Sequence, residues 1–138
     1  MKSKLLFLFI LLFLTSCTKN SKDSPITFGD VVDLSNLEKV TMRNNSGTFI
    51  LTTSQLEKLK KELSTMVYEP NIGVKVGSIG FDLYMNGNVH RVLTRTKGNY
   101  IEVDRDLITK NSTILVSKAP YYFQTNGVNF DNYKKENK

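Results

Sequence analysis

The sequence contains very few of the residues from which disulfides, metal sites and catalytic centres are usually built. Among its 138 residues there are one cysteine, one histidine and no tryptophan. A single cysteine excludes a disulfide within the chain. A zinc site takes three or four ligands of the histidine, cysteine or carboxylate type, so we expect no metal site. Phosphate-binding loops and dinucleotide-binding fingerprints are also missing, and we therefore expect no cofactor.

The chain also lacks an apolar run long enough to cross a membrane, although it begins with a short one. Leu5 to Leu14 are ten unbroken apolar residues, whereas a membrane-spanning helix needs about 20. Lys2 and Lys4 precede the run, and the small residues Thr15 and Ser16 follow it. This order is typical of a secretory signal peptide.

The end of this segment, Leu14-Thr15-Ser16-Cys17, resembles the bacterial lipobox, in which an apolar residue and two small residues precede a cysteine. Thr15 is bulkier than the alanine or serine that is most common there. The resemblance covers residues 1–17 and implies a bacterial lipoprotein. In such a protein a signal peptide, here residues 1–16, is removed, and acyl chains such as palmitate are attached through the cysteine, here Cys17. Two or three acyl chains hold a protein at a membrane, whereas one binds only marginally.

A lipid on Cys17 implies a location in the cell envelope, with the membrane as the first partner. In many Gram-negative lipoproteins an aspartate after the cysteine retains the protein at the inner membrane. Thr18 stands there in this chain, so the resemblance favours the outer membrane if the bacterium is Gram-negative. Removal of Lys2 and Lys4 lowers the net charge from +6 to +4, and the basic residues are scattered among acidic ones. We therefore expect no nucleic acid as a partner.

The mature chain is expected to consist of a tether and one domain. Residues 17–27 comprise the lipidated cysteine and a polar, flexible tether. Residues 28–138 have the size of a single domain. Their hydrophobic pattern predicts an α+β fold, with an N-terminal hairpin, one amphipathic helix and an antiparallel meander of three or more strands. We expect the helix to pack on one face of the sheet.

The hairpin and the helix have distinct local signals. Apolar and β-forming residues at 37–42 and 48–52 flank a cluster of turn residues and predict the hairpin. Ser54 and Glu57 have the spacing of a capping box, which predicts a helix start. Apolar residues then recur at helical spacing: Leu56, Leu59, Leu63 and Met66.

The meander is predicted from alternating residues at 79–85 and from Asn86-Gly87, because a type I′ turn needs positive φ at both central positions. Counting outward from this turn pairs Phe81 with Val92. It also pairs Asp82 with Arg91, an acid with a base.

Beyond this hairpin the sequence predicts strands at 100–103 and 114–116, whereas residues 121–123 fit either an edge strand or a loop. Five aromatic residues lie among polar ones in this part of the chain: Tyr121, Tyr122, Phe123, Phe130 and Tyr133. Exposed aromatic residues of this kind bind glycan rings or anchor protein interfaces, so the five are a candidate binding surface. The alternative is that they complete a small core.

No set of residues predicts a catalytic centre. His90 would have to serve any Ser-His-Asp or Cys-His arrangement, but the hairpin register places it beside core residues, which favours a structural role. Glu102, Asp104 and Asp106 alternate and could act as acid and base or hold a cation weakly, although a solvated strand edge is the favoured interpretation. Asp104 and Asp106 also have the spacing that opens a calcium loop, but the glycine and glutamate required further on are absent.

These patterns lead us to expect a non-enzymatic envelope lipoprotein whose domain binds a protein or a cell-wall component such as a glycan. Two alternatives stay open. One is a small hydrolase built on the three carboxylates, which would need them in one cleft with a raised pKa. The other is a purely structural envelope lipoprotein.

Overall fold

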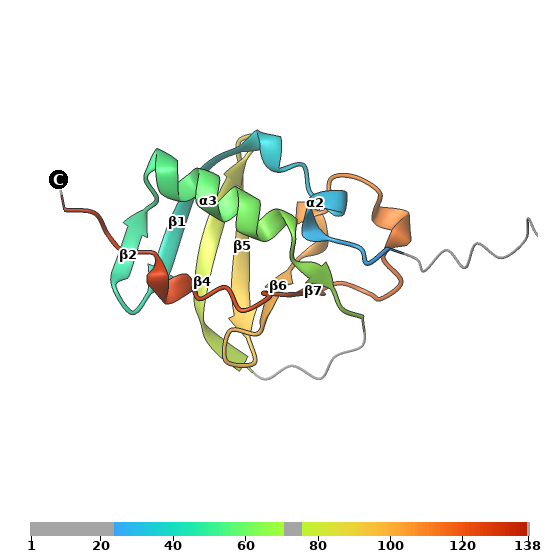
Figure 1. Cartoon of the computed structure of the whole chain (residues 1–138). Helices are drawn as coiled ribbons and strands as arrows, with labels where there is room; N and C mark the ends of the chain where they lie inside the picture. Colours follow the sequence, from blue (N-terminus) through green and yellow to red (C-terminus); the bar gives the residue numbers. More distant parts are fainter. Residues whose placement is uncertain (1–23, 71–75, 138) are drawn as a thin grey trace, which may run out of the picture.

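The structure, a computed structural model, describes residues 24–70 and 76–137 (Figure 1). In this part of the chain the strands form one antiparallel sheet with the order β2-β1-β4-β5-β6-β7-β3. The strands are β1 (Leu37–Asn44), β2 (Gly47–Ile50), β3 (Val67–Tyr68), β4 (Val76–Met85), β5 (Asn88–Arg95), β6 (Tyr100–Val103) and β7 (Tyr121–Gln124). The α-helices are α2 (Phe28–Val31) and α3 (Thr53–Ser64), and the 3₁₀ helices are η1 (Leu34–Asn36), η2 (Arg105–Leu107), η3 (Ser112–Ile114) and η4 (Phe130–Asn132).

The combination of helix and sheet confirms the α+β class, but the sheet is larger than the predicted meander. Strands β4 to β7 are neighbours in the order of the sequence, whereas β1 lies beside β4 and β3 lies beside β7. The short helix α2 was not predicted. Helix α3 lies across one face of the sheet (Figure 1), and Leu59, Leu63 and Met66 are fully buried.

The hairpin β4–β5 has the register that its turn predicts. Phe81 pairs with Val92, and Asp82 pairs with Arg91. The turn residues Asn86-Gly87 have φ values of 49° and 76°, as a type I′ turn requires. Because successive strand residues point to opposite faces, this register places Phe81 and Val92 in the core and Asp82 and Arg91 on the outer face. The first predicted hairpin is also present, as β1 and β2.

The cap of α3 differs from the prediction by two residues. Thr52 and Gln55 form the capping box, with each side chain bonded to the main-chain amide of the other, in place of Ser54 and Glu57. Both pairs have the required spacing, so the sequence alone does not separate them. The Leu51 amide still donates to a β1 carbonyl, and the helix therefore begins directly after this last sheet contact.

The strand predicted at 114–116 is wrong, because these residues belong to η3 and the loop after it. Asn111 adopts a φ of 51° and turns the chain before η3. The amides of Thr109 and Lys110 donate to the carbonyl of Val31 at the end of α2. The chain just before η3 is therefore hydrogen-bonded to a helix and not to a strand of the sheet. The next strand is β7, which pairs with β6 and β3 and is not an edge strand.

Ile26 and Thr27, the last two residues that the sequence analysis assigned to the tether, belong to the folded domain. The Tyr68 amide donates to the Ile26 carbonyl over 2.8 Å, and Thr27 pairs with Val67. Ile26 and Thr27 therefore pair with the short edge strand β3.

Residues 125–134, which we call the C-terminal segment, run beside α3 on the same face of the sheet (Figure 1). The Tyr133 hydroxyl donates to the Glu62 carboxylate, and burial together with this bond raises the pKa of Tyr133 well above its ordinary value. The Asn44 side chain donates to the carbonyls of Phe130 and Tyr133, over 2.8 Å in each case. The last residue of β1 therefore holds the C-terminal segment in place.

Replacement of Asn44 by alanine is expected to loosen the C-terminal segment, because two part-buried carbonyls lose their donor. We expect the free energy of unfolding, measured by urea denaturation, to fall by about 1–3 kcal/mol, and tryptic cleavage at Lys134 to become faster. Asn132→Ala changes an exposed asparagine of η4 and is the matched control. If both variants lose the same stability, Asn44 does not hold the segment.

Candidate functional site

The five C-terminal aromatic residues do not form one exposed surface, so this prediction is corrected. Four of them are buried in the core: Tyr121, Phe123, Phe130 and Tyr133. The Phe123 ring packs edge-on against Phe28, with centroids 5.1 Å apart. Tyr122 points to the other face of the sheet, where it is half-buried, because neighbouring residues of β7 alternate between the faces. The aromatic residues mainly complete the core, as the alternative interpretation stated.

The structure does not bring the three predicted carboxylates into one arrangement. The Glu102 carboxylate accepts two hydrogen bonds from Arg95, at 2.7 and 3.1 Å, whereas Asp104 and Asp106 are exposed. His90 is half-buried and pairs with Leu83 across β4 and β5. Among residues 24–70 and 76–137, no three histidine, cysteine or acidic residues lie close enough to hold a metal ion.

The sheet face that points away from α3 has an ion-pair network centred on Asp82. This residue is 7 % exposed, and its carboxylate lies 2.5 Å from Arg43 Nη2 and 3.1 Å from Arg91 Nε. Burial acts to raise the pKa of Asp82, but the hydrogen bonds and charges of the two guanidinium groups outweigh it and hold this pKa below its ordinary value. The network joins three neighbouring strands and stabilises the sheet.

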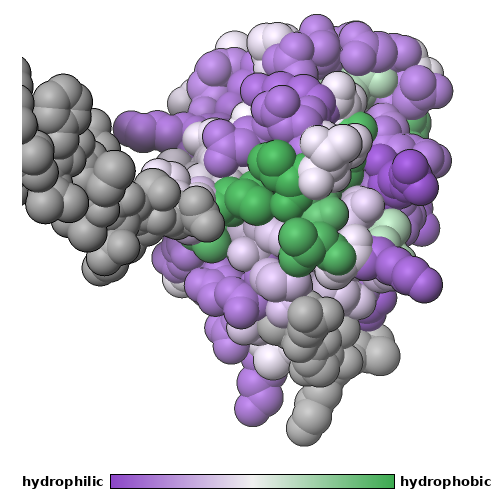
Figure 2. Space-filling model, turned by 90° about the vertical axis from the view of Figure 1, so that its right-hand side faces the viewer, coloured by the Kyte–Doolittle hydropathy of each residue, from purple (hydrophilic) through white to green (hydrophobic). Residues whose placement is uncertain are grey.

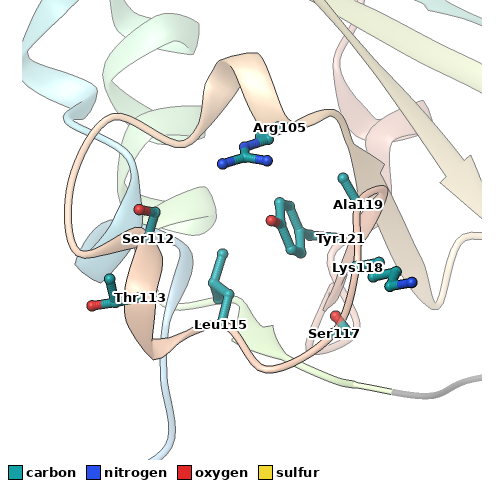
Figure 3. A pocket seen from close by; sticks show the side chains of 8 residues that line it. All are labelled: Arg105, Ser112, Thr113, Leu115, Ser117, Lys118, Ala119 and Tyr121. Carbon is teal, nitrogen blue, oxygen red and sulfur yellow. The ribbon is translucent and has the colours of Figure 1, made fainter.

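A hollow of about 560 Å³ opens in the segment that joins β6 to β7 (Figure 3). Its lining consists of eight residues: Arg105, Ser112, Thr113, Leu115, Ser117, Lys118, Ala119 and Tyr121. In Figure 3 the side chains of Arg105, Leu115 and Tyr121 point toward the centre of the hollow. Lys118 lies at its rim, with its amino group turned outward, and the hydroxyls of Ser112 and Thr113 also point away from the centre (Figure 3).

Hydrogen bonds to two distant parts of the fold position the wall of the hollow. The Ser117 amide donates to the Tyr68 hydroxyl over 2.9 Å, and the Tyr68 ring meets Tyr121 edge-on, with centroids 6.4 Å apart. On the other side, the Asn111 side chain donates to the Asp30 carbonyl over 2.9 Å. Strand β3 and helix α2 thus hold the segment at both ends of η3.

The chemistry of the hollow suits an anionic group. Arg105 supplies a positive charge inside the hollow and Lys118 a second one at its rim, the hydroxyls of Ser117 and Tyr121 can donate, and none of the described lining residues is acidic (Figure 3). A guanidinium can bind a carboxylate or a phosphate through two parallel hydrogen bonds. Leu115 and Tyr121, both largely buried, form an apolar floor.

Sequence reasoning missed this hollow. It considered Arg105 only within a calcium loop that lacks its later ligands, and it assigned residues 114–116 to a strand. One sequence feature argued against a strand here: Ile114, Leu115 and Val116 are three consecutive apolar residues between polar ones, without the alternation of a half-buried strand. Its placement depends on Tyr68 and Asp30, which are far away in the sequence, so no local pattern could locate the hollow.

Comparisons with models of protein families, with curated proteins and with solved structures found no match. None of the helices formed by residues 24–70 and 76–137 is long and apolar enough to cross a membrane. The hollow is therefore interpreted from its own geometry.

Replacement of Asp82 by asparagine is expected to destabilise the protein at pH 7 by about 1–3 kcal/mol, because its ion pair with Arg43 is lost and its hydrogen bond from Arg91 weakens. The folded-state pKa of Asp82 lies below its ordinary value of 3.8. Its ionised form therefore stabilises the fold above that value, and this stabilisation is lost as the pH falls through the folded-state pKa.

Urea denaturation at a series of pH values checks this expectation. The difference in unfolding free energy between the wild type and Asp82→Asn should shrink below pH ~4. A difference that is constant from pH 7 to pH 2 would show that the Asp82 charge contributes nothing.

Proposed function

We propose that this chain is an envelope lipoprotein, anchored through lipid on Cys17, whose folded domain is a non-enzymatic binding module. The hollow is its binding site, and the ligand is an envelope component with an exposed carboxylate or phosphate. The outer membrane is the favoured location if the bacterium is Gram-negative.

The anchor is supported by the order of residues 1–17 and by the use of cysteine. Cys17 is the only cysteine in the chain, and an unpaired thiol is unusual in a protein exported to an oxidising compartment. Attachment of lipid at that position would account for this cysteine.

The observation that most supports a binding role is the lining of the hollow. The Arg105 side chain points into it (Figure 3), and no acidic residue among the described lining residues offsets the charges of Arg105 and Lys118. A site with cations, hydroxyls and an apolar floor can orient an anionic ligand without reacting with it.

The alternative hydrolase has less support. Its catalytic pair would come from Glu102, Asp104 and Asp106, but the Glu102 carboxylate is already bonded to Arg95. Asp104 and Asp106 are exposed, and none of the three lines the hollow.

The anchor is tested with Cys17→Ala. Without the thiol no acyl chain can be attached, and the protein should move from the membrane fraction to the soluble fraction after cell disruption. Ser21→Ala, a change of a nearby hydroxyl, should leave the protein in the membrane fraction. If Cys17→Ala fractionates like the wild type, the lipoprotein assignment is wrong.

The binding site is tested with Arg105→Ala. In the wild type, titration with inorganic phosphate should shift the NMR amide signals of Ser117 and Tyr121. In Arg105→Ala the affinity should fall about ten- to a hundredfold, because a charged hydrogen bond is worth about 1.5–3 kcal/mol.

Lys135→Ala makes the same change of charge at an exposed lysine beyond the C-terminal segment and should bind phosphate like the wild type. An equal loss in both variants would indicate general attraction by net charge, and would contradict a site in the hollow.

A further inference from the structure

The hollow lies on the side of the molecule where the described chain begins. The main chain of Ile26 is bonded to the amide of Tyr68, and the Tyr68 hydroxyl accepts a hydrogen bond from the Ser117 amide. One strand, β3, therefore separates the first residues of the domain from the wall of the hollow. In Figure 1 the start of α2 and the segment between β6 and β7 (orange) lie together at the right, and the C-terminus lies at the opposite end.

This side also has exposed apolar side chains. Val116 is 80 % exposed and Ile114 is 39 % exposed, and both adjoin Leu115 of the hollow. Figure 2, which looks onto this side, shows an apolar area surrounded by hydrophilic residues. Val116 is more exposed than the other large apolar residues of the described chain that lie at the surface, Ile50 and Val89. We call the surface formed by Ile114, Val116 and the hollow the anchor-side face.

The length of chain between the proposed anchor and the fold limits where this face can lie. Six residues lie between Cys17 and Ser24, and a fully extended chain over these seven Cα–Cα steps spans at most about 25 Å. A domain of this size is itself about 30–35 Å across. Lipid on Cys17 would therefore keep the side that bears Ile26 close to the bilayer surface.

Charge determines what this face can bind there. Between β6 and β7 three basic residues, Arg105, Lys110 and Lys118, exceed the two acidic ones, Asp104 and Asp106, by only one charge. The net charge of this part of the chain therefore attracts an anionic surface only weakly. The hollow, with Arg105 and the hydroxyls of Ser117 and Tyr121 inside it and Lys118 at its rim (Figure 3), is the place where a phosphate can be held by specific donors.

We propose that the anchor-side face rests on the membrane that holds the lipid of Cys17, and that the ligand of the hollow is the phosphate of an anionic phospholipid. Ile114 and Val116 enter the headgroup region, as exposed aliphatic side chains do at membrane interfaces, while Arg105 and Lys118 bind the phosphate. The inference rests on the proposed function, because it takes Cys17 as the anchor and the hollow as the binding site.

The absence of tryptophan from the chain makes a direct test feasible, because a single introduced tryptophan is the only source of indole fluorescence. Val116→Trp and the control Ile50→Trp are made in the lipidated full-length protein. Ile50 is also well exposed, at 58 %, but lies in β2, at the opposite edge of the sheet from β3. Both proteins are reconstituted into vesicles of phosphatidylcholine alone or with phosphatidylglycerol.

Co-flotation of the protein with the vesicles is measured first, and it shows only whether the lipid on Cys17 attaches the protein to the membrane. Fluorescence then reports on the orientation: for Val116→Trp we expect a blue-shifted emission and quenching by phospholipids with brominated acyl chains, both greater with phosphatidylglycerol. For Ile50→Trp we expect neither. Adding Arg105→Ala and Lys118→Ala to Val116→Trp should remove the difference between the two lipid compositions.

The outcomes separate the inference from the function on which it rests. Protein that does not float with the vesicles overturns the anchor and the inference together. Protein that floats but shows the same emission for Val116→Trp and Ile50→Trp overturns the inference alone, and leaves a soluble anion, an envelope protein or the cell wall as the source of the ligand. Equal quenching in both lipid compositions overturns the assignment of an anionic phospholipid as the ligand, since phosphatidylcholine carries a phosphate but no net charge.

Discussion

One helix of 12 residues is too short to cover a sheet of seven strands, and much of the structure follows from this mismatch. At about 1.5 Å per residue α3 is roughly 18 Å long, whereas seven strands about 4.8 Å apart span roughly 29 Å. The rest of the apolar face needs other cover. The C-terminal segment supplies part of it, with the Phe130 ring against Phe81, and α2 supplies another part, with Phe28 against Phe123. Irregular chain and the short helix α2 therefore cover the part of the apolar sheet face that a second long helix covers in many α+β domains.

The features of the fold that could be predicted are those of its regular elements, and those that could not lie in the irregular chain that covers the rest of the sheet. The register of β4 and β5 follows from Asn86-Gly87, because the φ values of a two-residue turn and the alternation of Phe81 and Asp82 are local properties. The buried face of α3 follows from spacing alone for the same reason. The roles of Phe130 and Tyr133 were left open, because aromatic residues in irregular chain have no period that tells core from surface. Only contacts with residues far away in the sequence, such as those of Asn44, place them.

The candidate site arises from the same constraint. The chain between β6 and β7 lies over the edge of the sheet near β3, held by α2 on one side and by Tyr68 on the other. Because it is a loop and not a strand, it covers this edge incompletely. Leu115 is buried while its neighbours Ile114 and Val116 are exposed, and a hollow is left that is lined by Leu115 and Arg105 among others. The sequence could supply the residue types of this site but not their assembly. The proposed lipid anchor differs in this respect, because the order of four consecutive residues, Leu14-Thr15-Ser16-Cys17, is enough to suggest it.

The position of the C-terminal segment also affects when the domain can fold. Phe130 and Tyr133 are buried and complete the core beside α3, and they are synthesised after α3 and after every described strand. A nascent chain that ends before them has α3 and the sheet but leaves the Phe81 ring without its neighbour. Closure of the core is therefore delayed until the C-terminal segment has been synthesised and can pack beside α3.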